Sequence, residues 1–273
     1  IKTDRGKRHV EMEQLVDKYR KKYSFDEILT RAEDDLLRSG RTYSTMGGLV
    51  TAIRESSIFE EKQAYSSASN NGRGRCMLMN TDTVTAALIA CNASGCGKVA
   101  VLNFASFTHP GGGFIYGAMA QEEAICHSST LYNVLNENKA FYEQNNSFVN
   151  DGLYNDRALY TPSILFIGEK GSRVVDVITC AAPSKTEALS HGIPEDTIDR
   201  TMEKRIAFMY DVALSNQVDT LILGAWGCGV FGNDPEKVCK TMIAYCPKEM
   251  SVIFAIPGGA NYEAFNKVME SEV

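Results

Sequence analysis

Two adjacent carboxyl side chains follow a run of three glycines in this sequence. The run is Gly111, Gly112 and Gly113, and seven further residues separate it from the triplet Gln121-Glu122-Glu123. Neighbouring side chains on a helix point about 100° apart, so only one of the two glutamates can face a reacting atom squarely. Burial and a neighbouring negative charge favour a protonated carboxyl near neutral pH, which is the state of a general acid. Glu122 and Glu123 are therefore the candidate catalytic residues.

The triplet also has a purely structural explanation, because Gln and Glu are common caps in the first turn of a helix. Three consecutive glycines are harder to explain in that way. Ordering glycine loses more conformational entropy than ordering any other residue, so a fold by itself gains little from such a run. The combination of glycines and carboxyl groups therefore favours a ligand.

A second glycine-rich segment, Gly227-Cys228-Gly229-Val230-Phe231-Gly232, lies between an apolar strand and a helix. Its spacing is that of the G-x-G-x-x-G dinucleotide fingerprint. That fingerprint also needs an acidic residue after the following strand to bind the ribose, and Pro257-Gly258-Gly259 occupies the place. A nicotinamide-dependent oxidoreductase is therefore disfavoured, while a site for a pyrophosphate remains.

Three loops are predicted to meet at one edge of the sheet. They are the triple-glycine loop (residues 103–120), the second glycine loop (residues 226–234) and residues 257–260. Ligands of open α/β sheets bind where loops leave the carboxyl ends of strands. The first two loops lead into helices, whose backbone N–H groups attract anions. We expect a phosphate-containing ligand there.

Near-continuous apolar strands alternate with helices after residue 75, which is typical of a sheet covered on both faces. Strands are expected at 76–80, 98–104, 174–181, 220–225 and 251–256, and helices at 81–93, 121–136, 195–216, 235–245 and 262–270. Residues 40–75 are expected to be irregular apart from a short helix at 49–55. Residues 138–173 are expected to form a long irregular connection that can include one strand, at 164–167. The pattern predicts one α/β/α sandwich domain, residues 1–273, with two amphipathic helices at 10–39 in an N-terminal extension, residues 1–50.

The composition, with 44% hydrophobic and 23% charged residues, is that of a soluble globular protein, and no apolar run approaches the ~18 residues of a membrane span. The net charge of −6 argues against a broad nucleic-acid-binding surface, and we expect no sequence-specific binding of nucleic acid.

Eight cysteines without C-x-x-C spacing and four scattered histidines predict reduced thiols, no metal site and an intracellular, cytoplasmic protein. Cys126-His127 is not expected to be a nucleophile pair, because adjacent helical side chains face apart.

Taken together, these motifs resemble the smaller, microbial type of poly(ADP-ribose) glycohydrolase. The resemblance covers residues from Ala52 to the C-terminus. It is carried by Gly-Gly-Gly with Gln-Glu-Glu, by Val101-Leu102-Asn103-Phe104-Ala105, by Ser129-x-Leu131-Tyr132 and by Gly227-Cys228-Gly229-Val230-Phe231-x-Asn233-Asp234-Pro235. The resemblance implies a macrodomain core, which is a three-layer α/β/α sandwich around a mixed sheet. This core agrees with the sandwich predicted from the alternation of strands and helices.

The resemblance also implies hydrolysis of the ribose-ribose O-glycosidic bond, mainly from the chain end, with release of ADP-ribose. Glu123 would be the general acid and base, Glu122 would hold ribose hydroxyls, and Gln121 would fix the loop. Gly111 to Gly113 and Gly227, Cys228, Gly229 and Val230 would surround the diphosphate. Phe231 would pack on the distal ribose, and Asn103 matches a ribose contact of macrodomains. Ser106 stands where the family often has Asn, which puts an amide contact there in doubt.

No cofactor is implied. The expected partners are poly(ADP-ribose) or ADP-ribosylated protein, with ADP-ribose as the product, in the reversal of ADP-ribosylation and the DNA damage response. We expect a monomer that binds no membrane. Two alternatives remain open at this point: a non-catalytic reader that binds ADP-ribose, and a hydrolase that removes single ADP-ribosyl units from protein.

Overall fold

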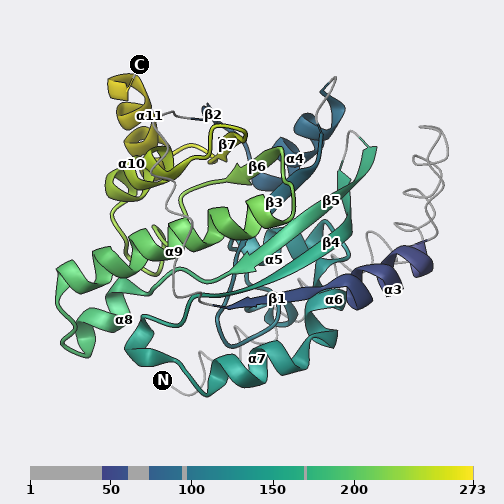
Figure 1. Cartoon of the computed structure of the whole chain (residues 1–273), viewed down its shortest axis with the longest axis horizontal. Helices are drawn as coiled ribbons and strands as arrows, with labels where there is room; N and C mark the ends of the chain where they lie inside the picture. The colour runs from purple at the N-terminus through teal and green to yellow at the C-terminus, as the bar shows by residue number, and fades with distance from the viewer. Residues whose placement is uncertain (1–44, 61–73, 94–96, 169–170, 273) are drawn as a thin grey trace, which may run out of the picture.

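A computed structural model of the chain describes residues 45–60, 74–93, 97–168 and 171–272 (Figure 1). The helices expected at 10–39, and most of the N-terminal extension, lie outside the described residues. Within the described residues, no helix combines the length and apolar character that crossing a membrane requires.

The described residues build a seven-stranded mixed sheet with the strand order β1-β4-β5-β3-β6-β7-β2 (Figure 1). The β1/β4 and β4/β5 pairs are antiparallel, and the other four pairs are parallel. The strands are β1 (Ser57–Glu60), β2 (Arg75–Met79), β3 (Val99–Phe104), β4 (Arg157–Gly168), β5 (Gly171–Cys180), β6 (Thr220–Leu223) and β7 (Ser251–Ala255).

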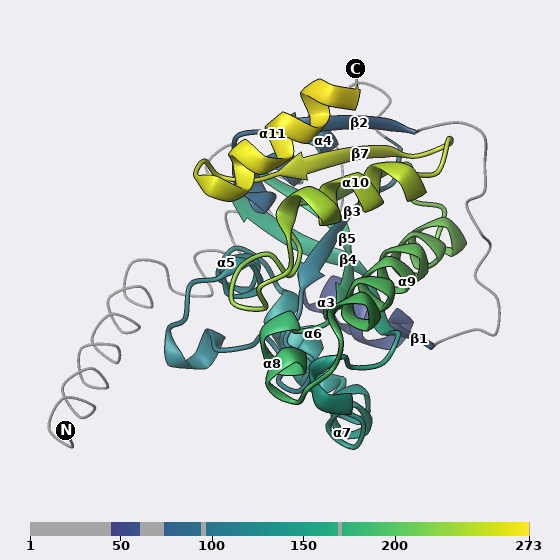
Figure 2. The same cartoon turned by 90° about the vertical axis from the view of Figure 1, so that its left-hand side faces the viewer.

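Helices lie on both faces of this sheet (Figures 1 and 2). They are α3 (Thr45–Glu55), α4 (Thr83–Asn92), α5 (Gln121–His127), α6 (Leu131–Glu137), α7 (Lys139–Asn146), α8 (Lys185–Ser190), α9 (Glu195–Ser215), α10 (Pro235–Tyr245) and α11 (Ala260–Glu272), with short 3-10 turns η1 (Phe114–Tyr116) and η2 (Asn150–Gly152). Alternate residues of the central strand β3 enter two different cores. Ala100 and Leu102 pack with α9, α10 and α11, whereas Val99 and Val101 pack with α4 to α7. The predicted three-layer α/β/α sandwich with a mixed sheet is therefore confirmed.

The prediction of a single helix at 121–136 is wrong. The chain forms α5 and α6 instead, because the link between them pairs with β4. The N–H of Thr130 donates to the carbonyl of Leu165, and the N–H of Ile167 donates to the carbonyl of Ser128. A bridge between Ser129 and Phe166 completes this contact. Pairing across the chain thus interrupts a helical pattern that is continuous in the sequence.

The prediction that most of residues 138–173 form a long irregular connection is also wrong. This segment holds α7 and the 12-residue strand β4, which pairs with β5 over most of its length. The register shifts between Thr161 and Ile164, where Ser163 has a φ of 60° and its N–H donates to Asp176 Oδ1 at 2.9 Å. Strand β1 in the segment expected to be irregular, and the short helix α8, were not predicted from the sequence.

Candidate active site

Gln121 fixes the start of α5 to the end of β3. Its Oε1 accepts a hydrogen bond from the N–H of Phe104 at 2.9 Å, and its Nε2 donates to the carbonyl of Leu102 at 2.8 Å. The same Nε2 donates to Thr83 Oγ1 at 3.2 Å. The amide group of Gln121 is thus occupied by contacts within the protein. This geometry agrees with the predicted role in fixing the loop, since it places the next two residues at the carboxyl end of the central strand.

Glu122 is buried, with only 4% of its surface exposed. Its Oε2 accepts from the N–H of Ser106 at 2.7 Å, and its Oε1 accepts from Asn103 Nδ2 at 3.1 Å. The pKa of Glu122 is raised from 4.5 to about 8, chiefly by burial; the charge of Glu123 acts in the same direction, and hydrogen bonds from Ser106, Asn103 and the Gly111 backbone oppose the rise. Near neutral pH Glu122 therefore retains its proton, the neutral state that the sequence predicted for one member of the pair.

Glu123 is held at one carboxyl oxygen only. Its side chain is 6% exposed, and Oε1 accepts a hydrogen bond from the N–H of Gly113 at 2.8 Å. Its other oxygen, Oε2, is buried and finds no hydrogen-bond partner among the described residues. A buried polar atom without a partner is unfavourable by about 1–3 kcal/mol, so its persistence suggests a group that a ligand completes.

The three glycines pack directly against these carboxyl groups. Gly112 has a φ of 58°, and a Cβ atom added to it would lie 2.6 Å from Glu123 Oε1 and 3.0 Å from Glu122 Oε2. A Cβ on Gly113 would meet the Cβ of Ala118 at 2.7 Å, and one on Gly111 would meet the ring of Tyr132 at 2.7 Å. The close approach that requires glycine in this loop is therefore an approach to the protein's own glutamates and their surroundings.

Asn103 lies behind Glu122. Its side chain is fully buried, and its Nδ2 also donates to Thr179 Oγ1 at 3.3 Å, while its Oδ1 has no partner among the described residues. The structure thus assigns Asn103 a contact with a catalytic candidate, and the predicted contact with ribose stays a prediction. Ser106 reaches Glu122 through its backbone N–H, a contact that an Asn at this position would make equally.

The second glycine loop is built on different contacts. A Cβ on Gly227 would lie 2.7 Å from Asn233 Nδ2 and 2.8 Å from the Cβ of Ala182, and one on Gly232 would lie 2.6 Å from Thr186 Oγ1. Asn233 is buried and its Nδ2 donates to the carbonyls of Pro183 and Gly227 at 2.8 and 3.0 Å. These two glycines and Asn233 therefore serve the internal packing of the loop.

The middle of this loop is open. A Cβ on Gly229 would meet nothing within 4 Å, and Val230 is 90% exposed. Among the described residues, no hydrogen-bond partner is found for the backbone N–H groups of Gly229, Val230 and Phe231. Successive unpaired N–H groups form a concave site for anions. Burial raises the pKa of the Cys228 thiol to about 12, so Cys228 is a small neutral side chain in the loop.

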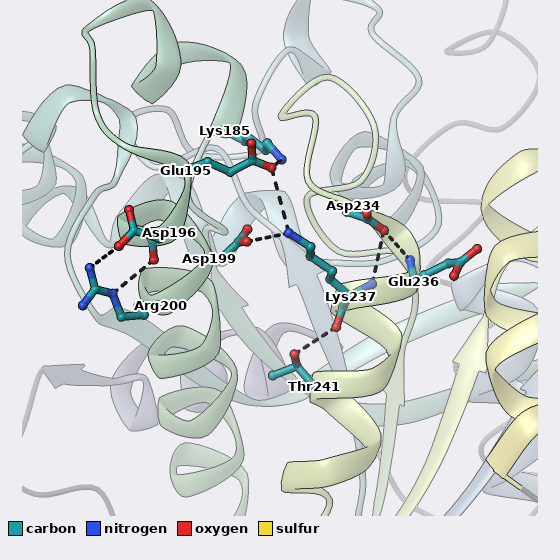
Figure 3. Close-up of polar contacts among 9 residues, drawn as sticks. All are labelled: Lys185, Glu195, Asp196, Asp199, Arg200, Asp234, Glu236, Lys237 and Thr241. Carbon is teal, nitrogen blue, oxygen red and sulfur yellow. Dashed lines mark hydrogen bonds and ion pairs between the residues drawn. The ribbon is translucent and has the colours of Figure 1, made fainter.

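Charged side chains connect α8 and α10 to α9 next to the end of this loop (Figure 3). Asp234 caps α10 by accepting from the N–H groups of Glu236 and Lys237 at 2.9 and 3.2 Å. Lys237 in turn donates to Asp199 at 2.7 Å, and Lys185 pairs with Glu195. Exposed ion pairs add little stability individually, but the cap and the Pro235 that follows it define where the loop ends.

An aromatic row joins the two glycine loops. Phe107 of the triple-glycine loop stacks on Tyr154, with ring centroids 4.6 Å apart. Tyr154 in turn contacts Phe231 of the second glycine loop at 6.1 Å, and its hydroxyl donates to Glu187 Oε2 at 3.2 Å. Sequence reasoning placed Phe231 near the ligand but missed Tyr154. No local pattern marks Tyr154, because its importance follows from its position between two segments far apart in the chain.

Residues 28–169 match the protein family described as microbial-type PARG, catalytic domain, where PARG denotes poly(ADP-ribose) glycohydrolase. This match spans more than half of the chain. The chain therefore belongs to the microbial-type poly(ADP-ribose) glycohydrolase family. The family confirms the resemblance found in the sequence, and its activity confirms the predicted enzyme class, glycosidase.

Solved structures of this glycohydrolase family cover most of the chain. The poly(ADP-ribose) glycohydrolase of Thermomonospora curvata, bound to the inhibitor ADP-HPD, is 30% identical, with 88% of this chain and 97% of that chain covered and a TM-score of 0.73. The enzyme from Deinococcus radiodurans, in complex with ADP-ribose, is 29% identical, with 83% and 98% covered and a TM-score of 0.71. A search of curated protein sequences gives no match.

The remaining candidates of this glycohydrolase fit a structural role. Burial raises the pKa of the Cys126 thiol, and burial also lowers the pKa of His127 against the opposing charge of Glu123. A buried thiol and an imidazole so placed do not favour the ion pair of a nucleophilic cysteine. Among the residues that the structure describes, no group of three or more His, Cys, Asp or Glu side chains is arranged to hold a metal ion.

Proposed function

We propose that this protein hydrolyses the ribose-ribose bond of poly(ADP-ribose), with Glu123 as the general acid and base. One observation carries the assignment of Glu123. The Gly113 N–H fixes its Oε1, while the buried Oε2 has no hydrogen-bond partner among the described residues. A catalytic carboxyl needs this arrangement, with one oxygen held and the other available to the reacting atom.

The proposed reaction breaks the bond between the anomeric carbon of one ribose and the oxygen of the next. Glu123 donates a proton to the departing oxygen while an oxocarbenium-like ribose develops. The resulting Glu123 carboxylate then accepts a proton from the attacking water, whose oxygen bonds to the anomeric carbon. Both products are hydroxyl compounds, and Glu123 regains the proton that it donated.

Glu122 would hold the hydroxyls of the ribose that reacts. Its carboxyl is positioned by the Ser106 N–H and the Asn103 side chain, and its raised pKa keeps a proton in the pair near neutral pH. A protonated carboxyl can both donate to and accept from a hydroxyl. Its neutral state also limits the repulsion that Glu123 meets when it becomes a carboxylate by donating its proton.

The diphosphate would bind at the second glycine loop. Its successive unpaired N–H groups and the open space beside Gly229 support this placement. The triple-glycine loop is less suited, since the Gly112 N–H donates to His109 and the Gly113 N–H donates to Glu123. Phe231, supported by Tyr154, would pack on the ribose next to the diphosphate.

Replacing Glu123 with Gln tests the proposal. General acid-base catalysis contributes about 10²- to 10⁴-fold, so we expect release of ADP-ribose from poly(ADP-ribose) to fall by that factor. The dissociation constant for ADP-ribose, measured by calorimetry, should change by less than a few-fold. The matched control is Glu137→Gln, an exposed glutamate at the end of α6, which should keep full activity.

Two results would contradict the proposal in different ways. Unchanged turnover in Glu123→Gln would show that another group supplies the proton. Binding of ADP-ribose by the unsubstituted protein without any hydrolysis would favour a reader. Parallel assays with proteins that carry single ADP-ribosyl groups would then show whether polymer or single units are the preferred substrate.

A further inference from the structure

The turn between the glycines and α5 exposes large apolar side chains in a short stretch. Ile115 is 51% exposed, and Tyr116 and Met119 are each 63% exposed. Other exposed large hydrophobic residues in the described chain occur singly, whereas these three lie within five residues. We call residues 114–119 the apolar turn. Grouped exposed apolar side chains mark a surface that meets another molecule.

The apolar turn has a fixed conformation. The N–H groups of Tyr116 and Ala118 both donate to the carbonyl of Gly113, at 2.9 and 3.1 Å. Gly117 ends the 3-10 turn with a φ of 78°. The ring of Phe114 packs against the rings of His127 and Tyr132, with both centroid distances at 4.7 Å. The partly buried Phe114 side of the turn is thus packed on α5 and α6, and the three exposed side chains remain available.

This turn begins at the residue that holds the proposed catalytic carboxyl. Gly113 donates its N–H to Glu123 Oε1, and its carbonyl receives the two hydrogen bonds that shape the turn. Figure 2 shows the teal segment that leads into α5 standing out from the body of the domain on the left. The exposed apolar side chains are therefore connected, through the single residue Gly113, to the group that would protonate the leaving oxygen.

The chemistry of the polymer indicates what must lie beside this group. In poly(ADP-ribose) the departing oxygen is the 2′-hydroxyl oxygen of an adenosine, and the adenine base is attached to the neighbouring carbon of the same ribose. When Glu123 protonates that oxygen, the base of the leaving unit is held close to the Glu123 side of the site. A nucleobase has two apolar faces that stack on aromatic side chains, in any sequence context.

We propose that the apolar turn binds the adenine of the unit that carries the departing oxygen. Tyr116 would be the stacking residue, and Ile115 and Met119 would pack beside the base. The inference rests on the proposed function and adds a second base-binding site to it. The turn then acts only on substrates whose leaving group carries a base. A single ADP-ribosyl group on a protein side chain gains nothing from it, so the turn favours polymer over single units.

The test compares two leaving groups. Tyr116→Ala and Met119→Ala are assayed on poly(ADP-ribose) and on an O-glycoside of ADP-ribose with a simple aliphatic alcohol. Loss of base stacking should lower kcat/KM for the polymer about tenfold in Tyr116→Ala, equivalent to about 1.4 kcal/mol, and less in Met119→Ala. Hydrolysis of the aliphatic glycoside and the dissociation constant for ADP-ribose should stay within twofold.

Two further variants keep the result interpretable. Tyr116→Phe retains the ring and should retain polymer activity, which separates stacking from a hydroxyl contact. Phe148→Ala removes an aromatic residue that is 55% exposed outside the apolar turn and should leave both substrates unaffected. Thermal unfolding of each variant shows whether the fold is intact.

Three outcomes would overturn the proposal. Equal losses of kcat/KM on both substrates would give the turn a general structural role. Unchanged polymer hydrolysis with a lowered Tm in Tyr116→Ala would show that the turn packs against the protein's own chain. Unchanged hydrolysis with an unchanged Tm would show that the turn does not bind the base. If the unsubstituted protein cleaves neither substrate, the proposed function itself fails, which is a distinct result.

Discussion

The two glycine loops look alike in the sequence but use their glycines differently. In the triple-glycine loop, Gly112 makes room for the carboxyl oxygens of Glu122 and Glu123, and the N–H groups of Gly112 and Gly113 are occupied within the protein. In the second glycine loop, the outer glycines serve internal packing, while the N–H groups of residues 229–231 are unpaired in the described structure. The first loop therefore positions catalytic groups, and the second offers donors to an anion.

This difference bears on the diphosphate contact that the resemblance implies for residues 111–113, which stays a prediction. The contacts of Gly112 explain why the triple-glycine loop needs glycine there, since a side chain at this position would displace the carboxyl groups of Glu122 and Glu123. The contacts within the protein thus favour the second glycine loop for the diphosphate, since Gly229 faces open space there.

Among the substitutions that compare the two loops, the largest effect is expected from Gly112→Ala. The added Cβ would lie 2.6 Å from Glu123 Oε1, so the carboxyl must move, and a displacement of about 1 Å in an active site can lower the rate about 10²-fold. The φ of 58° adds about 1–2 kcal/mol of strain. Steady-state assays on poly(ADP-ribose) and urea denaturation measure the two effects separately.

A matched control for Gly112→Ala is available at Gly192. It has a φ of 79° and no atom within 4 Å of an added Cβ, so Gly192→Ala should carry the backbone strain alone. Full activity in Gly112→Ala, with the same loss of stability as Gly192→Ala, would remove the link between this glycine and the carboxyl pair.

The next effect concerns stability in the second glycine loop. Gly227→Ala combines a φ of 72° with contacts of 2.7 and 2.8 Å to Asn233 and Ala182, so we expect the free energy of unfolding to fall by about 2–4 kcal/mol. Urea denaturation measures this change. A variant as stable as Gly192→Ala would show that the contacts around Gly227 relax without loss.

Glu122→Gln should change how stability depends on pH. The folded-state pKa of about 8 lies above the ordinary 4.5, so between these values the folded state binds more protons than the unfolded state. The stability of the unsubstituted protein therefore falls as pH rises through this window, by up to about 1.4 kcal/mol per pH unit. Glu122→Gln lacks this loss, and its stability relative to the unsubstituted protein should increase with pH.

Denaturation curves at pH 5.5 and 7.5 give the comparison for Glu122. The exposed Glu137→Gln serves again as the control and should follow the unsubstituted protein at both pH values. If the stability difference between Glu122→Gln and the unsubstituted protein is the same at both pH values, Glu122 is ionised in the folded state throughout this range.

The smallest effect is expected at Gly229, and it separates the two loops most sharply. An added Cβ meets no atom of the protein there, so Gly229→Ala should fold with unchanged stability. If the diphosphate approaches this backbone, the methyl group obstructs it, and the dissociation constant for ADP-ribose should rise by about three- to tenfold. Equal affinity in calorimetry for Gly229→Ala and the unsubstituted protein would place the diphosphate elsewhere.

Local signals in the sequence sufficed for several elements. The apolar run of β3 and the Asp234-Pro235 start of α10 predicted those elements with bounds within a residue of the structure. Of strand β4, only the part at 164–167 could be predicted in this way, because Pro162 and the bulge beside it break the local pattern. Its stability comes from pairing with β1 and β5, and strand propensity depends strongly on such context.

The sequence by itself determined the chemistry that is available: a pair of carboxyl groups at a helix start, an amide before them and two glycine loops after apolar strands. It could not determine the contact of each polar atom. That Gln121 holds β3, that Asn103 orients Glu122 and that Tyr154 joins the two loops depends on segments up to tens of residues apart. The physical reason is that hydrogen bonds and ring contacts act over a few ångströms in space, and only the folded chain sets those distances.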